Sequence, residues 1–218
     1  MSKQREASRH AATIARRLKK HYAEAKCSLD FNSPLELLVA TILSAQCTDA
    51  RVNLVTPALF GKYPTVAHYA SVPQEELEAG IRSTGFFRNK AKNIRACCQA
   101  MLEKHDGQVP RSMEDLVALP GLGRKSANVI LGTAFGIGVG VVVDTHVTRL
   151  SQRLGLTKHK NAEKIERDLM ALFPQSQWID VAHQLVFHGR RVCTARKPQC
   201  VACPLNDICP GREEVASC

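Results

Sequence analysis

Apolar side chains recur along most of the chain at intervals of three and four residues, which is the spacing of one face of an α-helix. The clearest example starts at Ser33 and Pro34, since serine caps helix N-termini and proline fits the first turn. The apolar side chains expected to face the core there are Leu35, Leu38, Val39, Ile42 and Leu43. No strand-like alternation extends beyond the short run 141–143. The pattern therefore predicts an all-α fold.

Helical spacing between glycine, proline and capping residues predicts most of the other elements. Helices are expected at residues 3–24, 48–60, 87–105, 112–118, 145–154, 161–173 and 177–190. Ser176 is expected to cap the last of them. The first helix is basic and amphipathic, and its charged face could either approach a polyanion or simply be solvated.

Composition narrows the class of partner. Lys and Arg outnumber Asp and Glu by 30 to 20, and the formal net charge of +10 favours nucleic acid ahead of a membrane. An aromatic content of 5% argues against a stacking platform for single strands. No apolar run approaches the ~20 residues that span a bilayer, and no signal peptide is visible. We expect a cytoplasmic or nucleoid-associated monomer that binds duplex and no membrane.

The segment Pro120–Gly123 predicts a tight hairpin between the helix at 112–118 and a second helix that continues to about residue 131. Glycine adopts a positive φ at no steric cost and leaves backbone N–H groups uncovered. Together with the N-terminus of the second helix, these groups form a site suited to a phosphate oxygen. This helix-hairpin-helix makes Gly121, Gly123 and Arg124 candidates for contacts with the DNA backbone.

Lys125 lies in the first turn of that second helix. The positive end of the helix dipole disfavours its ammonium form, and partial burial would act in the same direction. A neutral amine there would be available as a nucleophile. The alternative is a lysine that only faces a phosphate, as Arg124 is expected to do.

A second candidate site is the C-terminal cysteine set, spaced C-x6-C-x2-C-x5-C. Structural zinc usually takes two close cysteine pairs, whereas this set has one close pair with longer arms on both sides. That spacing favours a [4Fe–4S] cluster over zinc, and disulfide pairing is a further alternative. The ligands would be Cys193, Cys200, Cys203 and Cys209.

Several motifs in the same order resemble the endonuclease III family of bifunctional DNA glycosylases and AP lyases, which belongs to the helix-hairpin-helix superfamily. The resemblance covers roughly residues 25–210. Besides the cysteine set, it rests on Leu43–Asp49, Leu119–Lys125, Val143–Val147 and Phe187–Arg190. In that family the central helices form one domain, while the N-terminal helix joins the C-terminal helices and the cluster in a second. The resemblance thus implies a domain at 27–137 and a discontinuous domain at 1–26 plus 138–218.

The resemblance also implies the chemistry. Breaking a glycosidic C1′–N bond develops positive charge on the sugar, which a nearby carboxylate stabilises. Asp144 is the candidate, although it could instead only cap the helix that starts at Thr145. Lys125 would then attack C1′ and form a Schiff base that leads to β-elimination. The implied substrate is double-stranded DNA with damaged, oxidised pyrimidines or abasic sites.

A base inside duplex DNA must be flipped out before it can react. Gln46 matches the family's intercalating glutamine, and the loop Ser83–Phe87, with Thr84, would supply the second wedge. Phe86 stands where the family commonly has an aliphatic residue, which puts substrate range and opposite-base preference in doubt. Phe87 is expected in the core.

Three cations near the cysteine set, Arg190, Arg196 and Lys197, are candidates for phosphate contacts. Three alternatives to the glycosylase reading stay open. One is a superfamily sibling with another base preference, and the second is a non-catalytic module that only holds damaged duplex. The third is a zinc- or iron-binding structural protein, which leaves the hairpin and the excess of basic residues unexplained.

Overall fold

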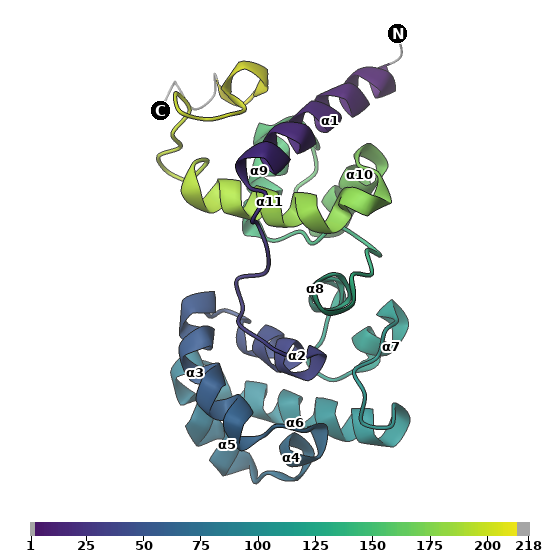
Figure 1. Ribbon diagram of the computed structural model, residues 1–218, viewed down its shortest axis with the longest axis vertical. Helices are drawn as coiled ribbons and strands as arrows, with labels where there is room; N and C mark the ends of the chain where they lie inside the picture. Colours follow the sequence, from purple (N-terminus) through teal and green to yellow (C-terminus); the bar gives the residue numbers. More distant parts are fainter. Residues whose placement is uncertain (1–2, 213–218) are drawn as a thin grey trace. The chain divides into compact units, whose positions relative to one another are not determined.

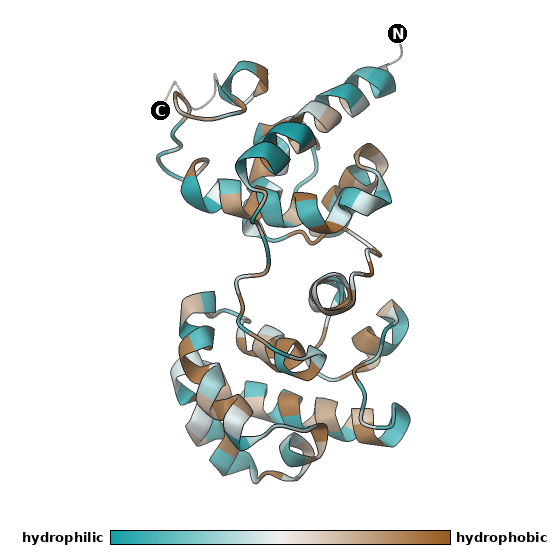
Figure 2. Cartoon of the chain, in the orientation of Figure 1, coloured by the Kyte–Doolittle hydropathy of each residue, from teal (hydrophilic) through white to brown (hydrophobic). Residues whose placement is uncertain are grey.

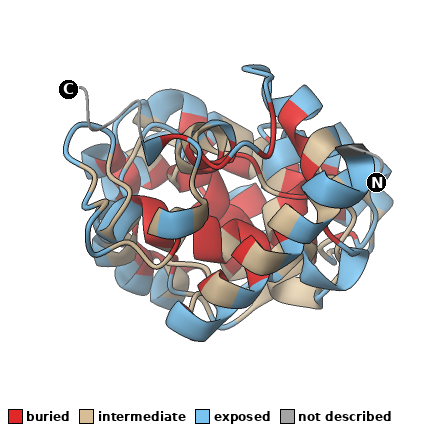
Figure 3. Cartoon of the chain, turned by 90° about the horizontal axis from the view of Figure 1, so that it is seen from above, coloured by how far each residue is buried: buried red, intermediate tan, exposed pale blue. Residues whose placement is uncertain are grey.

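The computed structural model describes residues 3–212, and every regular element within that range is a helix (Figure 1). The all-α prediction is therefore confirmed. The chain forms two compact units: residues 27–137 make one, and residues 1–26 with 138–218 make the other. Most helices carry both buried and exposed residues along their length (Figure 3). Within the described range, no helix is long and apolar enough to cross a bilayer.

The unit at 27–137 is built around one long helix, α6, against which α2, α4 and α5 pack. Helix α8 packs on α2 and α7, so the two helices of the hairpin are joined to this core. The elements are α2 (Pro34–Leu43), α3 (Asp49–Lys62), α4 (Val66–Ser71), α5 (Gln74–Ile81), η1 (Arg82–Thr84), α6 (Phe87–Lys104), α7 (Met113–Ala118) and α8 (Arg124–Phe135). Its largest fully buried side chains include Leu37, Tyr69, Ile94, Met101 and Ile130.

In the other unit, α11 and α10 each pack against both α1 and α9. The elements are α1 (Lys3–His21), α9 (Thr145–Arg153), α10 (Ala162–Leu172), η2 (Gln175–Gln177), α11 (Trp178–Arg191) and η3 (Asn206–Ile208). Helix α1 is mostly hydrophilic (Figure 2), and its two large apolar side chains, Ile14 and Leu18, are fully buried. Burial of this narrow apolar stripe attaches the N-terminal helix to the C-terminal ones.

Capping residues set the starts of several helices where the sequence predicts them. The Ser33 side chain accepts a hydrogen bond from the Glu36 N–H, and the Glu36 carboxylate accepts one from the Asn32 N–H. Ser112 caps α7 in the same way, through the N–H of Asp115. Each such cap satisfies a backbone donor that the first turn leaves without a partner.

Two local predictions are wrong. Ser176 does not cap α11: it lies inside η2, and α11 begins at Trp178 without a side-chain cap. Leu35 is only partly buried, whereas Leu37, which the pattern did not place in the core, is fully buried. Helix α2 is in contact with α3, α6 and α8, so it is buried on most of its circumference. A pattern with a single apolar face therefore predicts too few of its buried residues.

Candidate active site and cysteine cavity

Gly121 holds the hairpin between α7 and α8 in a conformation that other residues rarely adopt. Its φ is +81°, and a Cβ placed on it would lie 2.7 Å from the Cβ of Asn93 in α6. Leu122 beside it is 7% exposed and anchors the hairpin in the core. The glycine is thus required both by the backbone conformation and by its close approach to α6.

Gly123 has a different role from the one predicted. Its φ is −108°, so it does not need the left-handed conformation, and a Cβ there would meet nothing within 4 Å. It occupies the N-cap position of α8 without a side-chain cap, next to the first N–H groups of the helix, which have no intrahelical acceptor. The hairpin therefore places backbone N–H groups at the start of a helix, the position that favours an anion, as the motif predicts.

Lys125 is exposed on the first turn of α8, and Arg124 before it is exposed as well. The conditional expectation that partial burial would favour the neutral amine is therefore not met. What remains as predicted is its position in the first turn of α8, directly after the hairpin. An exposed side chain at this place can reach a ligand held on the hairpin.

Asp144 is the N-cap of α9, with its Oδ1 atom 2.8 Å from the N–H of Val147, which donates to it. Val141 and Val143 before it are buried, so the segment that carries the carboxylate is fixed to the core of its unit. Asp144 itself is partly buried. Lys125 belongs to the 27–137 unit and Asp144 to the other one.

The two predicted wedge residues share an unusual backbone. Gln46 has φ +52° and Phe86 has φ +48°, both in the left-handed region that non-glycine residues rarely occupy. Both side chains are exposed, Phe86 by 63%. Strain of this kind persists only where the surroundings impose it, and it is concentrated at functional positions.

The prediction that the Thr84 side chain contacts DNA does not agree with the structure. Its side chain is only 2% exposed, and its hydroxyl donates to the carbonyl of Ile81 at 2.8 Å. It therefore shapes the end of η1 and is not available to a ligand. Phe87 is half-buried, with the guanidinium groups of Arg82 and Arg88 lying over its ring.

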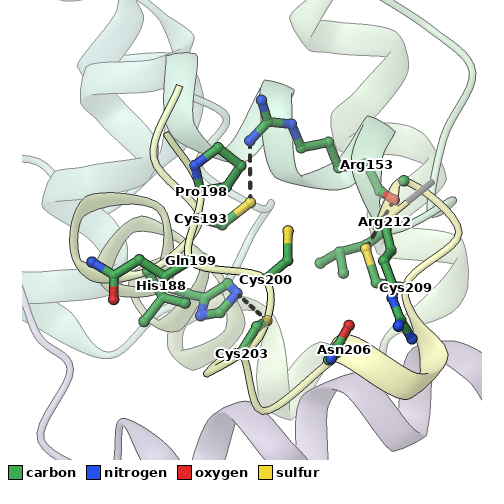
Figure 4. Close-up of a pocket in the computed structure, with 13 residues that line it drawn as sticks. Arg153, His188, Cys193, Pro198, Gln199, Cys200, Cys203, Asn206, Cys209 and Arg212 are labelled. Atoms are coloured by element: carbon green, nitrogen blue, oxygen red, sulfur yellow. Dashed lines mark hydrogen bonds between the residues drawn. The ribbon is translucent and has the colours of Figure 1, made fainter. Parts of the chain in front are cut away.

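The four predicted ligand cysteines line one cavity in the C-terminal loop, together with Arg153 and His188 (Figure 4). Among residues 3–212, no group of three or more His, Cys, Asp or Glu side chains could hold a single metal ion. Thiols that surround a space rather than meet at a point fit a multi-iron cluster better than zinc. The donor set thus agrees with the predicted cofactor.

Side chains from two helices, Arg153 and His188, brace this loop, and neither was among the predicted site residues. Arg153 of α9 donates to the Cys193 sulfur at 3.3 Å and to the carbonyl of Thr194 at 2.8 Å. His188 of α11 has its Nε2 atom 3.5 Å from the Cys203 sulfur and its Nδ1 atom 2.9 Å from the Tyr22 hydroxyl. Burial lowers the pKa of His188 to about 4, so the ring is neutral at physiological pH. The loop is therefore connected to α9 and α11, and through His188 to Tyr22, the residue directly after α1.

The predicted cations at this end of the chain, Arg190, Arg196 and Lys197, are all exposed. Arg190 lies in the last turn of α11, and the other two lie in the loop between Cys193 and Cys200. They are therefore accessible on the same unit as Asp144.

Comparison with known proteins gives the class of this fold and site. The family described as HhH-GPD superfamily base excision DNA repair protein matches residues 39–175, which include the hairpin and Asp144. The iron–sulfur binding domain of endonuclease III matches residues 193–209, from the first to the last of the four cysteines. The fold and the site thus define a base excision DNA repair protein with an iron–sulfur cluster.

Individual relatives narrow the family. The chain is 58% identical to the endonuclease III of Synechocystis sp., with 90% of each chain covered, and 41% identical to that of Escherichia coli, covering 93% and 95%. A structure of a non-covalent endonuclease III–DNA complex superposes with a TM-score of 0.92 at 42% identity over the whole of both chains. The chain belongs to the endonuclease III family.

Proposed function

We propose that this enzyme excises oxidised pyrimidines from duplex DNA and then cleaves the strand at the resulting abasic site, with Lys125 as nucleophile. The observation that carries the proposal is the position of Lys125. Its exposed amine lies two residues after Gly123, at the open N-terminus of α8, where a bound phosphate would place the adjacent sugar within reach.

Each step can be assigned to an atom of this chain. The neutral Nζ of Lys125 attacks C1′ while the C1′–N bond breaks, and the base leaves with the bonding electron pair and takes up a proton. The Asp144 carboxylate stabilises the positive charge that develops on the sugar. The Nζ atom then loses a proton, and its electron pair forms the C=N bond as the C1′–O4′ bond breaks. The ring oxygen takes up a proton, which leaves a protonated imine between Lys125 and C1′.

Strand cleavage follows from that imine. When C2′ loses a proton, the electron pair of the C2′–H bond forms a C2′=C3′ double bond. The C3′–O bond breaks, and the 3′ phosphate leaves with its electron pair. Water then hydrolyses the imine and releases Lys125. A lysine is needed for this second reaction because a hydroxide nucleophile would leave no imine to activate C2′.

The remaining candidate residues hold the substrate in this proposal. Donors at Gly123 and the start of α8 bind phosphate, while Gln46 and Phe86 enter the duplex where the damaged base leaves it. Cys193, Cys200, Cys203 and Cys209 would hold the iron–sulfur cluster, and their ligation would fix the loop that carries Arg196 and Lys197. Structures of endonuclease III with DNA, including a trapped covalent intermediate matched at 42% identity, support this assignment.

Borohydride trapping on a duplex with a single oxidised pyrimidine tests the proposal. We expect a covalent protein–DNA product from the wild type, none from Lys125→Ala, and the wild-type amount from Lys104→Ala, which alters an exposed lysine at the far end of α6. Trapping on an abasic site alone would mean that the base pocket accepts another lesion. DNA binding without trapping on either substrate would refute the proposal in favour of a non-catalytic binder.

A further inference from the structure

Lys90 is a buried lysine that the mechanism above does not use. It lies in the first turn of α6, and only 4% of it is exposed. Both features disfavour a charged side chain, because burial removes water and the helix dipole is positive at this end. Burial accordingly lowers its pKa. A buried lysine at this position destabilises the fold unless its Nζ atom forms hydrogen bonds.

Its partners are two backbone carbonyls. The Nζ atom donates to the carbonyl of Leu43 at 2.8 Å and to the carbonyl of Thr84 at 2.8 Å. Leu43 is the last residue of α2, and Thr84 is the last residue of η1. Carbonyls at helix C-termini lack intrahelical donors and carry partial negative charge, so both are good acceptors for an ammonium group.

The two carbonyls lie at the start of the two wedge segments. Leu43 comes three residues before Gln46, and Thr84 comes two residues before Phe86. Both wedge residues hold left-handed backbones, as does Gly85 at φ +69°. The Lys90 side chain thus connects the N-terminal ends of two strained segments that are about forty residues apart in sequence.

We propose that Lys90 is a positioning residue that fixes the spacing between Gln46 and Phe86, so that the two side chains enter the duplex together. Lys90 does not touch the DNA; it acts through the two carbonyls. The inference rests on the proposed function, because it assigns the wedge role to these two residues. If the N-terminal ends of the two segments separate, each wedge side chain can still enter DNA alone. The distance between the two side chains, however, no longer matches the gap that a flipped nucleobase leaves.

Single-turnover excision by Lys90→Met tests this inference. Methionine fills similar space without donors, and Lys92→Met makes the same exchange at an exposed position of the same helix. Two substrates are compared: the oxidised pyrimidine paired in duplex, and the same lesion in an unpaired bulge, where little wedging is needed. We expect Lys90→Met to slow excision of the paired lesion by about tenfold or more. On the bulged lesion its rate should stay within about twofold of wild type.

A purely structural role predicts a different result, namely equal loss on both substrates, and that outcome would overturn the inference. So would an unchanged rate on the paired lesion. If Lys90→Met does not fold, Lys90→Leu, which also removes both hydrogen bonds to the carbonyls, replaces it with the same two readings. Wild-type excision in the same assay separates the two proposals: if wild type excises the paired lesion and Lys90→Met does so equally well, only the inference fails.

A double-mutant cycle gives an independent test. In a Gln46→Ala, Phe86→Ala background there is no wedge pair left to position, so Lys90→Met should add no more than about a twofold further loss on the paired lesion. A further loss as large as in the wild-type background would show that Lys90 acts through another route, and the inference would be wrong.

Discussion

Gly121 and Asn93 are packed so closely that the hairpin has no room for a Cβ, which would lie 2.7 Å from the Asn93 Cβ atom. We expect Gly121→Ala to lower the free energy of unfolding by about 1–3 kcal/mol, because it adds this overlap to an unfavourable φ of +81°. Thermal unfolding measures the change. A melting temperature equal to that of wild type would show that α6 and the hairpin can separate at no cost.

Gly123→Ala is the matched variant two residues away. Its methyl group meets no atom of the chain within 4 Å, so the cost is limited to the loss of a favoured N-cap residue, and stability should fall by no more than about 1 kcal/mol. DNA affinity, however, should fall by about tenfold, because the methyl group covers the amides that face a phosphate. Titration with an undamaged duplex measures this. Unaltered affinity would mean that the backbone donors at this glycine do not contact DNA.

Asp144 combines a cap with a proposed catalytic charge, and two substitutions separate them. Asn caps a helix about as well as Asp, so Asp144→Asn should keep the stability of α9 but lose at least about 100-fold in base excision. Asp144→Ala should lose the same activity and also about 1 kcal/mol of stability. Unfolding curves and single-turnover excision distinguish the two effects. Full activity in Asp144→Asn would restrict this residue to capping.

We expect that Phe86 lowers the stability of the fold but is needed for activity. Glycine accepts φ +48° without strain, and the ring is 63% exposed, so Phe86→Gly should raise the free energy of unfolding by up to about 1 kcal/mol. Excision of a paired lesion should fall by roughly tenfold because the apolar wedge is lost. Both quantities are measured on the same preparation. A variant that is less stable and equally active would identify Phe86 as a packing residue.

The helix starts were predictable because capping is local chemistry. Ser33, Ser112 and Asp144 each bond the N–H three residues on, so the cap can be read from a few neighbouring letters. Burial depends on segments far apart in the sequence. Lys90 lies in sequence between the exposed Arg88 and Lys92, yet it is buried and its partners are residues 43 and 84.

The conformations of single residues were equally hard to predict. The hairpin motif suggests a positive φ for its glycines, but only Gly121 has one, because α6 approaches there and leaves Gly123 open. Nor does a first-turn position say whether Lys125 is buried, since exposure is decided by neighbouring elements. The motif therefore predicted the type of site, and the approach of α6 to the hairpin at Gly121 decided which glycine is required there.

Loss of the cluster should act on DNA binding through the loop between Cys193 and Cys200. Cys200→Ser removes a ligand, so we expect iron content and visible absorbance to fall and the loop to lose its fixed shape. Each phosphate contact contributes about 0.9 to the slope of log affinity against log salt, so freeing Arg196 and Lys197 should reduce that slope by about 2. The double variant Arg196→Ala, Lys197→Ala should show the same reduction with the cluster intact. If this variant keeps the wild-type slope, the loop cations do not contact phosphates, and the cluster's contribution to binding lies elsewhere.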